Sequence, residues 1–491
     1  MYTLGVLLGR AFSFLLLPVY TRYLSPADYG IIQLVELTFD VLTLVAGTRI
    51  AAGLFHFHEK ASTVAQKKAV LSTTMLALAA GYAVVAVGAA LLASTLSRLV
   101  FDDATRTTVV RIASVSFLFQ GLLIVPLAEI RRQEKPLLFV ALTSGKLIVQ
   151  ATLNVVFLVV MRYGVLSMFL SNLLSSGAMA VCLSIYLIRQ TGLRFSAPVL
   201  KDLVRFGVPL VATQVATIFT TFGDRFFLRR AVDNTIAGHS TAGIAAVGIY
   251  ALAYQFGFLL AGLAVDPFLS VWQPVRFKLA REKNRDQIFS HAFVMLNVML
   301  VTIAVGIGLF VRDVLGIITT PAFQPASELV PVLLLAYVIG SWAAAQDTGI
   351  MLRERTEFIT YANWASAVVA LIGYLFLIPR FFGWGAAWST LAAFVARQLI
   401  LYKAAQRLWP IRYDWRPVWK LLGLGSALVG IRMIVHIDQR ALSILVSAAL
   451  FVVYVFGVWY AGILPESVRQ SLIRGLRSPR TALSSLLPDT T

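Results

Sequence analysis

Charged residues are scarce in this chain. Lys, Arg, Asp and Glu make up 13% of its 491 residues, whereas they make up about 25% of an ordinary soluble domain. Hydrophobic residues account for 59%, and the mean hydropathy is +0.81. This composition excludes an ordinary soluble protein and predicts an all-α protein that crosses a membrane many times.

Acidic residues are scarcer than basic ones, with 23 Asp and Glu against 42 Lys and Arg and a formal net charge of +19. In a soluble protein this excess would suggest binding to nucleic acid. Here the basic residues are spread over short joints between apolar segments, so we expect membrane insertion and no nucleic-acid partner.

Cysteine is almost absent, because Cys182 is the only one. It lies within an apolar segment, and a single cysteine excludes an intramolecular disulfide. His56 and His58 share a joint with no cysteine nearby and no helical metal spacing. The sequence therefore predicts no metal site and no cofactor.

Long apolar stretches are abundant, and about 14 of them could cross a bilayer as helices. They lie near residues 4–21, 30–54, 70–96, 109–128, 137–160, 165–188, 203–223, 242–265, 288–310, 328–350, 357–378, 384–403, 417–436 and 441–461. No joint between them could hold a soluble domain. The first stretch has neither a basic leader nor a cleavage site, so we expect it to be retained. Residues 196–206 and 465–476 are expected to form amphipathic helices on the membrane surface.

Lys and Arg favour one set of alternate joints. That set and the C-terminal tail hold about 26 of these residues, and the other set holds about 12. The richer joints lie near residues 60–68, 131–135, 189–205, 276–285, 353–355 and 403–420. Because basic joints stay in the cytoplasm, the pattern predicts an even number of spans with both termini cytoplasmic.

A short pattern of proline, arginine beside an aromatic residue, and glycine occurs twice. It appears as Pro18, Thr21-Arg22-Tyr23 and Tyr29-Gly30-Ile31, and again as Pro209, Asp224-Arg225-Phe226 and Val247-Gly248-Ile249. Six spans separate the copies, which predicts two six-helix lobes related by a pseudo-two-fold axis along the membrane normal. We expect lobes at residues 1–190 and 191–405, with two extra transmembrane helices and a cytoplasmic tail at 406–491.

Several charged residues interrupt the predicted spans, where each costs about 2.5–3.5 kcal/mol unless it faces water, a partner or a substrate. They indicate a polar cavity inside the protein. The candidate substrate-binding cations are Arg10, Arg49, Lys146 and Arg397. The candidates for internal ion pairs or ion coupling are Glu36, Asp40, Asp347, Asp224 and Arg225.

The segment from Leu17 to Gly30, LPVYTRYLSPADYG, with Gly9-Arg10 before it, resembles the opening of bacterial oligosaccharide flippases. These form the polysaccharide transporter family of the multidrug/oligosaccharidyl-lipid/polysaccharide exporter superfamily. The later segments Phe206–Leu210, Gly223–Leu228 and Gly248–Tyr250 are similar to the start of that family's second lobe.

This resemblance implies a transporter without enzymatic activity. It would flip an undecaprenyl-pyrophosphate-linked oligosaccharide across the bacterial inner membrane, for O-antigen, capsule or exopolysaccharide synthesis. The two lobes would alternate between inward-open and outward-open arrangements, and a polysaccharide polymerase and a chain-length regulator would be partners. A cationic cavity would suit the anionic pyrophosphate.

Three other functions compete with this prediction. An ion-coupled multidrug exporter shares the architecture, but it would be expected to carry a carboxylate in its first span, where this chain has Arg10 and no acid. A membrane glycosyltransferase or polymerase would need catalytic acids or metal ligands in long outer loops, and the outer joints here are short. A non-transporting scaffold would leave the intramembrane charges without a purpose.

Overall fold

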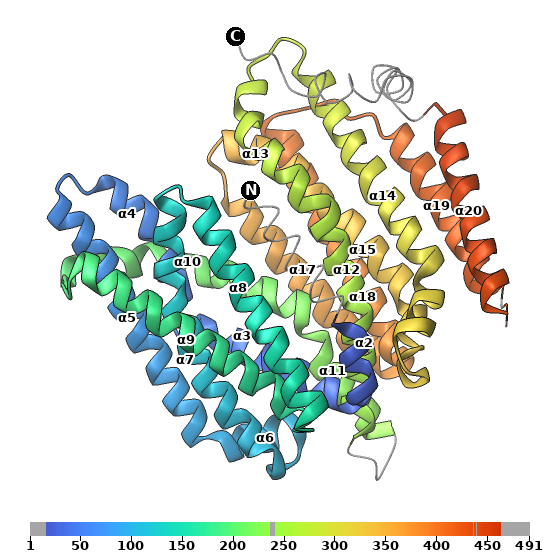
Figure 1. Ribbon diagram of the computed structural model, residues 1–491. Coiled ribbons are helices and arrows are strands. Elements are labelled where there is room, and N and C mark those ends of the chain that lie inside the picture. Colours follow the sequence, from blue (N-terminus) through green and yellow to red (C-terminus); the bar gives the residue numbers. More distant parts are fainter. Residues whose placement is uncertain (1–15, 236–240, 436, 438, 463–491) are drawn as a thin grey trace.

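The computed structural model describes residues 16–235, 241–435, 437 and 439–462, and this part of the chain folds into helices with no strand. Two helical bundles stand side by side, and two C-terminal helices pack against the outside of the second bundle (Figure 1). The all-helical membrane fold predicted from composition is confirmed.

The first bundle, called the N-lobe here, contains the helices up to residue 191. They are α2 (Leu17–Tyr23), α3 (Pro26–Val45), the short turn η1 (Thr48–Gly53), α4 (Leu54–Lys60), α5 (Val64–Leu91), α6 (Ala93–Phe101), η2 (Ala104–Arg106), α7 (Thr107–Arg132), α8 (Pro136–Val155) with the π-turn η3 (Val156–Val160), and α9 (Leu166–Thr191). Most of their buried aliphatic and aromatic side chains form one core, and a smaller cluster lies between α7 and α9.

The second bundle, the C-lobe, follows directly. It consists of α10 (Ala197–Phe222), α11 (Asp224–Thr235), α12 (Ala242–Leu260) with the π-turn η4 (Ala261–Val265), α13 (Asp266–Leu279), α14 (Arg285–Ile318), η5 (Pro321–Phe323), α15 (Ala326–Gln346), α16 (Thr348–Leu352), α17 (Glu357–Phe376) and α18 (Ile378–Leu408). The C-terminal pair is α19 (Arg416–Ile434) and α20 (Arg440–Tyr460). A second core joins this lobe to the pair.

Within the described residues, 11 helices are long and apolar enough to cross a membrane, or 12 if the bent pair Pro26–Val45 and Arg49–Lys60 counts as one span. This is fewer than the 14 predicted. The expected span at 4–21 lies mostly outside the described residues. The expected span at 384–403 is helical, within α18, but Arg397, Gln398 and neighbouring polar residues dilute its apolar content.

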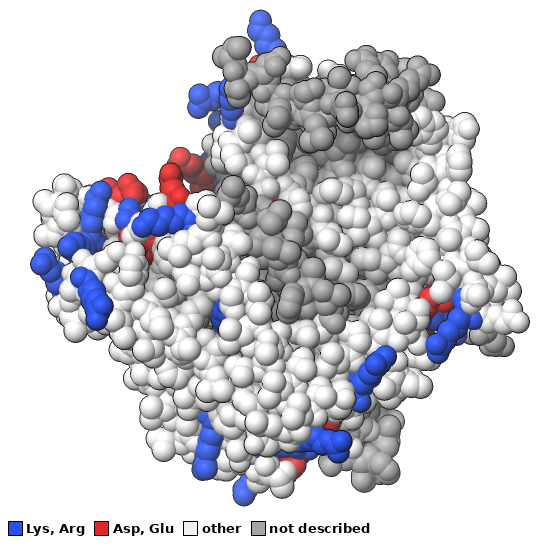
Figure 2. Space-filling model, viewed as in Figure 1, with Lys and Arg blue, Asp and Glu red and all other residues white. Residues whose placement is uncertain are grey.

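A wide uncharged band crosses the molecule, and Lys and Arg gather at its upper left and along its lower edge (Figure 2). The upper edge includes α4 and α13, and the lower edge includes α6 and α11 (Figure 1). The band has the distribution expected of a surface that faces lipid. The surface helix expected at residues 196–206 is wrong, because these residues form the first turns of the unbroken α10.

The two lobes meet where the repeated sequence pattern recurs. Helix α3 packs along α12, and a Cβ atom added to Gly248 would overlap the carbonyl oxygen of Pro26 and lie 2.9 Å from the Gly30 nitrogen. A Cβ atom on Gly30 would in turn overlap the carbonyl oxygen of Ile244. The glycines of both copies are therefore required because the two backbones touch.

A capping box positions this crossing. The Ser25 hydroxyl accepts a hydrogen bond from the Asp28 backbone N–H (3.1 Å), and the Asp28 carboxylate accepts one from the Ser25 N–H (3.0 Å). Pro26 occupies the first turn, where it favours helix initiation. The Ser-Pro-Ala-Asp segment thus fixes the start of α3, one turn before Gly30.

Two further contacts join the lobes at the lower edge. The Thr21 hydroxyl of α2 donates to the carbonyl oxygen of Ile318 at the end of α14 (3.1 Å). Arg229 of α11 donates to the carbonyl oxygen of Val100 and pairs with Asp102, both at the end of α6. The lobes are therefore held together at the membrane face whose joints carry fewer basic residues.

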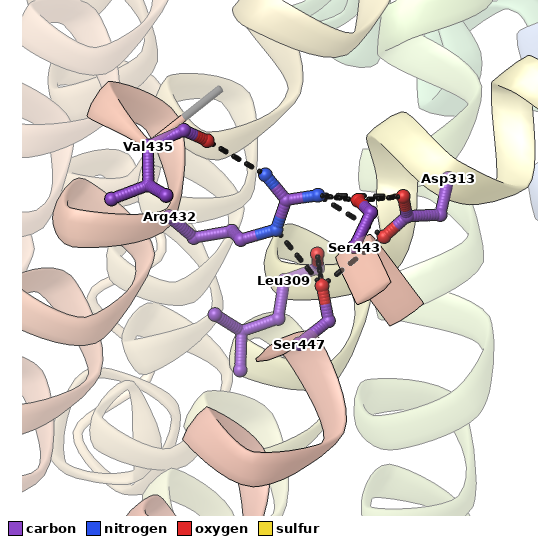
Figure 3. A network of polar contacts seen from close by, with 6 residues as sticks. All are labelled: Leu309, Asp313, Arg432, Val435, Ser443 and Ser447. Carbon is purple, nitrogen blue, oxygen red and sulfur yellow. Dashed lines mark hydrogen bonds and ion pairs between the residues drawn. The ribbon is translucent and has the colours of Figure 1, made fainter. Parts of the chain in front are cut away.

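A buried polar network attaches the C-terminal pair to the C-lobe (Figure 3). Arg432 of α19 donates to the Asp313 carboxylate of α14 (3.2 Å) and to the Ser447 hydroxyl of α20 (2.9 Å). Ser447 also donates to the carbonyl oxygen of Leu309 (3.0 Å), and Ser443 completes the network. One guanidinium group therefore ties three helices together.

Candidate functional site

A cavity of about 740 Å³, called the N-lobe chamber, opens among α2, α3, α7, α8 and α9 and reaches α12 of the other lobe. Its polar lining residues are Tyr20, Tyr29, Gln33, Glu36, Asp40, Thr43, Ser116, Gln120, Gln150, Asn154, Asn172 and Gln255. Its described lining contains two carboxylates and six side-chain amides, and no Lys or Arg. A volume of about 300–1,000 Å³ is typical of small-molecule sites.

Helical spacing brings these polar groups onto one surface. On α3, Gln33, Glu36, Asp40 and Thr43 recur every three or four residues and so share one face. Ser116 and Gln120 on α7, and Gln150 and Asn154 on α8, repeat the four-residue spacing. The chamber is therefore lined by polar stripes of otherwise apolar helices.

A second cavity of about 450 Å³, the C-lobe chamber, is enclosed by α10, α12, α13, α15, α17 and α18. Its polar lining residues are Thr221, Gln273, Tyr337, Ser341, Asp347 and Arg397. Phe258 of α12 lines both chambers. The two spaces thus adjoin on either side of this one aromatic ring.

Arg397 lies half-buried in the wall of the C-lobe chamber. Its Nε donates to the amide oxygen of Asn363 (2.8 Å), and its terminal guanidinium nitrogens make no hydrogen bond to a described residue. Asp347, in the same wall, already pairs with Arg276 of α13 (2.6 Å). Arg397 therefore keeps two nitrogens free to bind an anion.

Glu36 and Asp40 lie one helical turn apart in the wall of the N-lobe chamber, and both side chains are exposed. The Glu36 carboxylate accepts a hydrogen bond from the Gln33 amide (3.0 Å). Neither carboxylate forms an ion pair with a described residue. They are acceptors available to a solute in the chamber.

The other candidate cations lie elsewhere. Arg49 is in η1, outside the lining of both chambers, and its Nε is buried without a hydrogen-bond partner. Lys146 is half-buried on α8, beside the lining residue Leu147, and forms no ion pair with a described residue. Arg10 lies outside the described residues. Of the four proposed substrate-binding cations, the structure places one, Arg397, in a chamber wall.

Asp224 and Arg225 form a fully buried pair at the start of α11 (3.1 Å). Asp224 accepts a hydrogen bond from the Tyr250 hydroxyl (2.6 Å), and the guanidinium carbon of Arg225 lies 4.5 Å from the centre of the Tyr254 ring. Neither residue lines a chamber. Their contacts are those of an internal ion pair within α11 that packs against Tyr250 and Tyr254 of α12.

The sequence-based candidates did not include the amide residues of the N-lobe chamber, because all of the candidates were charged residues. The sequence signal of the amides is a helical spacing of polar residues. Ser116 and Gln120 are four residues apart, as are Gln150 and Asn154, and Gln33 and Glu36 are three apart. Uncharged amides in membrane helices also serve in helix packing, so this signal is weaker than an intramembrane charge.

The fold is similar to that of several solved transporters. The lipid II flippase MurJ in an inward closed conformation aligns with 94% of this chain and 99% of its own, at a TM-score of 0.74 and 13% identity. An inward-facing multidrug resistance MATE family transporter of the MOP superfamily covers 81% of this chain and 94% of its own, at a TM-score of 0.59 and 14% identity.

A MOP superfamily transporter from Pyrococcus furiosus, described as having a binding pocket of reverse polarity, covers 82% of this chain and 94% of its own (TM-score 0.53, 14% identity). These likenesses show a shared two-lobed transporter fold. No curated protein matches the sequence.

A family model described as "Polysaccharide biosynthesis protein" matches residues 19–328, which include the first copy of the repeated pattern from Thr21 onward, the lining of the N-lobe chamber except Leu17, and the α3–α12 crossing. The resemblance noted at Leu17–Gly30 is thereby confirmed. The chain belongs to this family of polysaccharide biosynthesis proteins.

Proposed function

We propose that this protein moves an undecaprenyl-pyrophosphate-linked oligosaccharide from the cytoplasmic to the periplasmic leaflet of the bacterial inner membrane. Transport proceeds by alternating access and leaves the substrate chemically unchanged. The glycan is destined for O antigen, capsule or exopolysaccharide, and a polymerase and a chain-length regulator act after the flipping step.

The observation that carries this proposal is the pair of adjoining chambers, one in each lobe, with the Arg397 guanidinium in the wall of the C-lobe chamber and two of its nitrogens without a hydrogen bond to a described residue. A lipid diphosphate needs such a donor, because its oxygens accept hydrogen bonds and carry negative charge. Family membership supports a polysaccharide precursor, and the flippase-like fold supports a lipid carrier.

In this proposal the upper edge in Figure 1, which includes α4 and α13, faces the cytoplasm. Both termini are then cytoplasmic, as the distribution of basic joints predicts. The bias of Lys and Arg supports this orientation. The α3–α12 crossing and the Arg229–Asp102 pair then close the periplasmic side. Glu36 and Asp40 are suited to ion coupling, and Arg10, Arg49 and Lys146 stay candidates for attracting the pyrophosphate.

Flipping of a fluorescently labelled, undecaprenyl-pyrophosphate-linked oligosaccharide in reconstituted vesicles tests the proposal. We expect Arg397→Ala to slow flipping at least about tenfold, since one charge-assisted contact contributes roughly 1.5–3 kcal/mol. Arg397→Lys should restore part of the rate, because Lys keeps the charge but not the bidentate geometry. Arg407→Ala, an exposed change on the same helix, is the control.

Full activity of Arg397→Ala at a normal protein level would refute the role of Arg397. Absence of flipping by the wild-type protein would refute the function itself.

A second function, export of small organic cations, is favoured by one observation. The described lining of the N-lobe chamber has Glu36 and Asp40 and no basic residue, an arrangement that attracts cations. Efflux of ethidium from cells that express the protein tests this alternative. Efflux that is lost in Glu36→Gln and Asp40→Asn, without flipping of lipid-linked glycan, would favour the exporter.

A further inference from the structure

Two buried polar atoms in the wall of the N-lobe chamber have no hydrogen-bond partner among the described residues. The Asn154 side chain is 4% exposed, and its Nδ2 donates to the Tyr20 hydroxyl (2.9 Å) while its Oδ1 is unbonded. The Ser116 hydroxyl, 2% exposed, is also unbonded. A buried polar atom without a partner costs about 1–3 kcal/mol, so two of them in one chamber wall indicate that a ligand supplies the missing bonds.

The remaining lining specifies the kind of ligand. Six amides provide donors and acceptors together, Glu36 and Asp40 add acceptors, and Tyr20 and Tyr29 add aromatic surface. Such a mixture matches sugar hydroxyls, which both donate and accept, and sugar rings, which present apolar C–H faces. It does not match a phosphate, whose oxygens only accept and whose charge the two carboxylates repel.

We propose that the N-lobe chamber is the glycan subsite and that it selects non-acidic, hydroxyl-rich sugars, with Ser116 and Asn154 as specificity-determining residues. This inference rests on the proposed function. The diphosphate then lies toward Arg397, on the other side of Phe258, which lines both chambers. Arg397 of the C-lobe therefore holds the diphosphate opposite the glycan, and the N-lobe cations Arg10, Arg49 and Lys146 act only in attracting the headgroup as it enters.

Polarity of the chamber sets its selectivity among sugars. A uronic acid would place its carboxylate among acceptors and beside Glu36 and Asp40, so its entry is unfavourable. A neutral or N-acetylated sugar meets no such repulsion. The chamber thus discriminates by charge as well as by hydrogen bonding.

Binding of three short-chain lipid diphosphates to the protein in nanodiscs tests the inference. The probes are farnesyl diphosphate, farnesyl diphosphate linked to an N-acetylglucosamine disaccharide, and the same conjugate with a terminal glucuronic acid. We expect the wild-type protein to bind the neutral conjugate at least about tenfold more tightly than either of the other two.

Ser116→Ala and Asn154→Leu should each weaken binding of the neutral conjugate about five- to tenfold and leave binding of farnesyl diphosphate unchanged. Ser116→Ala removes a hydroxyl that has no partner, so it should fold normally. Ser114→Ala is the matched control, because the Ser114 hydroxyl lies on the same helix outside the chamber lining and donates to the carbonyl oxygen of Val110 (2.8 Å).

The outcomes separate the two proposals. Suppose that farnesyl diphosphate binds and that Arg397→Ala weakens this binding. If the sugar then adds no affinity, or if the two chamber variants leave the added affinity intact, the glycan subsite is overturned and the proposed function stands. Preference for the glucuronic acid conjugate would also overturn it. If no lipid diphosphate binds, the proposed function fails and the subsite fails with it.

Discussion

Several residues of this protein carry a charge within predicted membrane spans, where contact with lipid would be energetically costly. Their surroundings in the structure differ. Arg397 keeps nitrogens free in a chamber wall, whereas Arg225 is enclosed by Asp224, Tyr250 and Tyr254. Intramembrane charge alone therefore does not distinguish a ligand-binding residue from a structural one. The contacts do.

Asp224→Ala should destabilise the protein by about 3–5 kcal/mol, because it leaves the buried Arg225 charge uncompensated. The double variant Asp224→Leu/Arg225→Met should be markedly more stable than the single one, since it removes both charges. Thermal unfolding of the detergent-solubilised variants measures this difference. A double variant no more stable than Asp224→Ala would contradict the structural role.

Sequence reasoning located charged residues within spans but could not rank them. Asp224-Arg225 stands at the end of a predicted span, and its enclosure comes from Tyr250 and Thr390, which are 26 and 166 residues away. Such long-range packing leaves no local pattern. The amides of the N-lobe chamber did leave one, the spacing of Gln150 and Asn154, but uncharged amides have other uses in membrane helices.

Local chemistry sets where α3 begins and where it packs closely against another helix. The capping box at Ser25 starts α3, and the repeated glycines mark its crossing with α12. The repeat was readable from sequence because backbone contact admits no residue but glycine. That the two copies touch each other was not readable, since the pattern says nothing about its partner.

Substitution of Gly248 by Ala should force α3 and α12 apart, because the new methyl group would overlap the Pro26 carbonyl oxygen. We expect a loss of about 1–3 kcal/mol in the stability of the closed crossing. Thermal unfolding in detergent reports the effect. Gly88→Ala on α5, where a methyl group meets open space, should leave the melting temperature nearly unchanged and serves as the control.

The attachment of α19 and α20 depends on Arg432. Arg432→Met would leave the Asp313 carboxylate buried beside Ser443 and Ser447 without its cation, at a cost of about 3–5 kcal/mol. Arg440→Ala, an exposed change at the start of α20, should have little effect. Equal melting temperatures for the two variants would show that the network contributes no stability.

Over the whole molecule, the lobes are held together at the lower edge, and each lobe contains one chamber. The two-bundle fold and the membrane class followed from hydropathy and from the repeat. The number of spans did not follow so simply, because α18 carries Arg397 in the wall of the C-lobe chamber and the polar Gln398 beside it, and so loses apolar character. The polar residues thus lower the hydropathy of one of the helices that line a chamber.

The Arg229–Asp102 pair should favour the arrangement in which the lower edge is closed. Arg229→Ala should shift the lobes toward an arrangement open at that edge by about 1–3 kcal/mol, a typical coupling energy. Spin labels at Leu99 on α6 and Arg230 on α11, both exposed, would report longer distances in a Cys182→Ser background.

Arg106→Ala is the control for this change, because Arg106 pairs with Asp103 within one lobe (3.8 Å). Unchanged distance distributions in Arg229→Ala would show that the pair does not hold the lower edge.

The contact between Gly30 and Gly248 bears on the evolutionary origin of the two halves of the chain. Equivalent positions of the two repeat copies contact each other here within a single polypeptide, as equivalent residues do across an isologous dimer interface. It is what a gene duplication would leave if the ancestral half-length chain had paired with a second copy of itself. The two halves cannot accept substitutions independently at this contact, because a bulkier residue at Gly30 or Gly248 would require a compensating change in the other half.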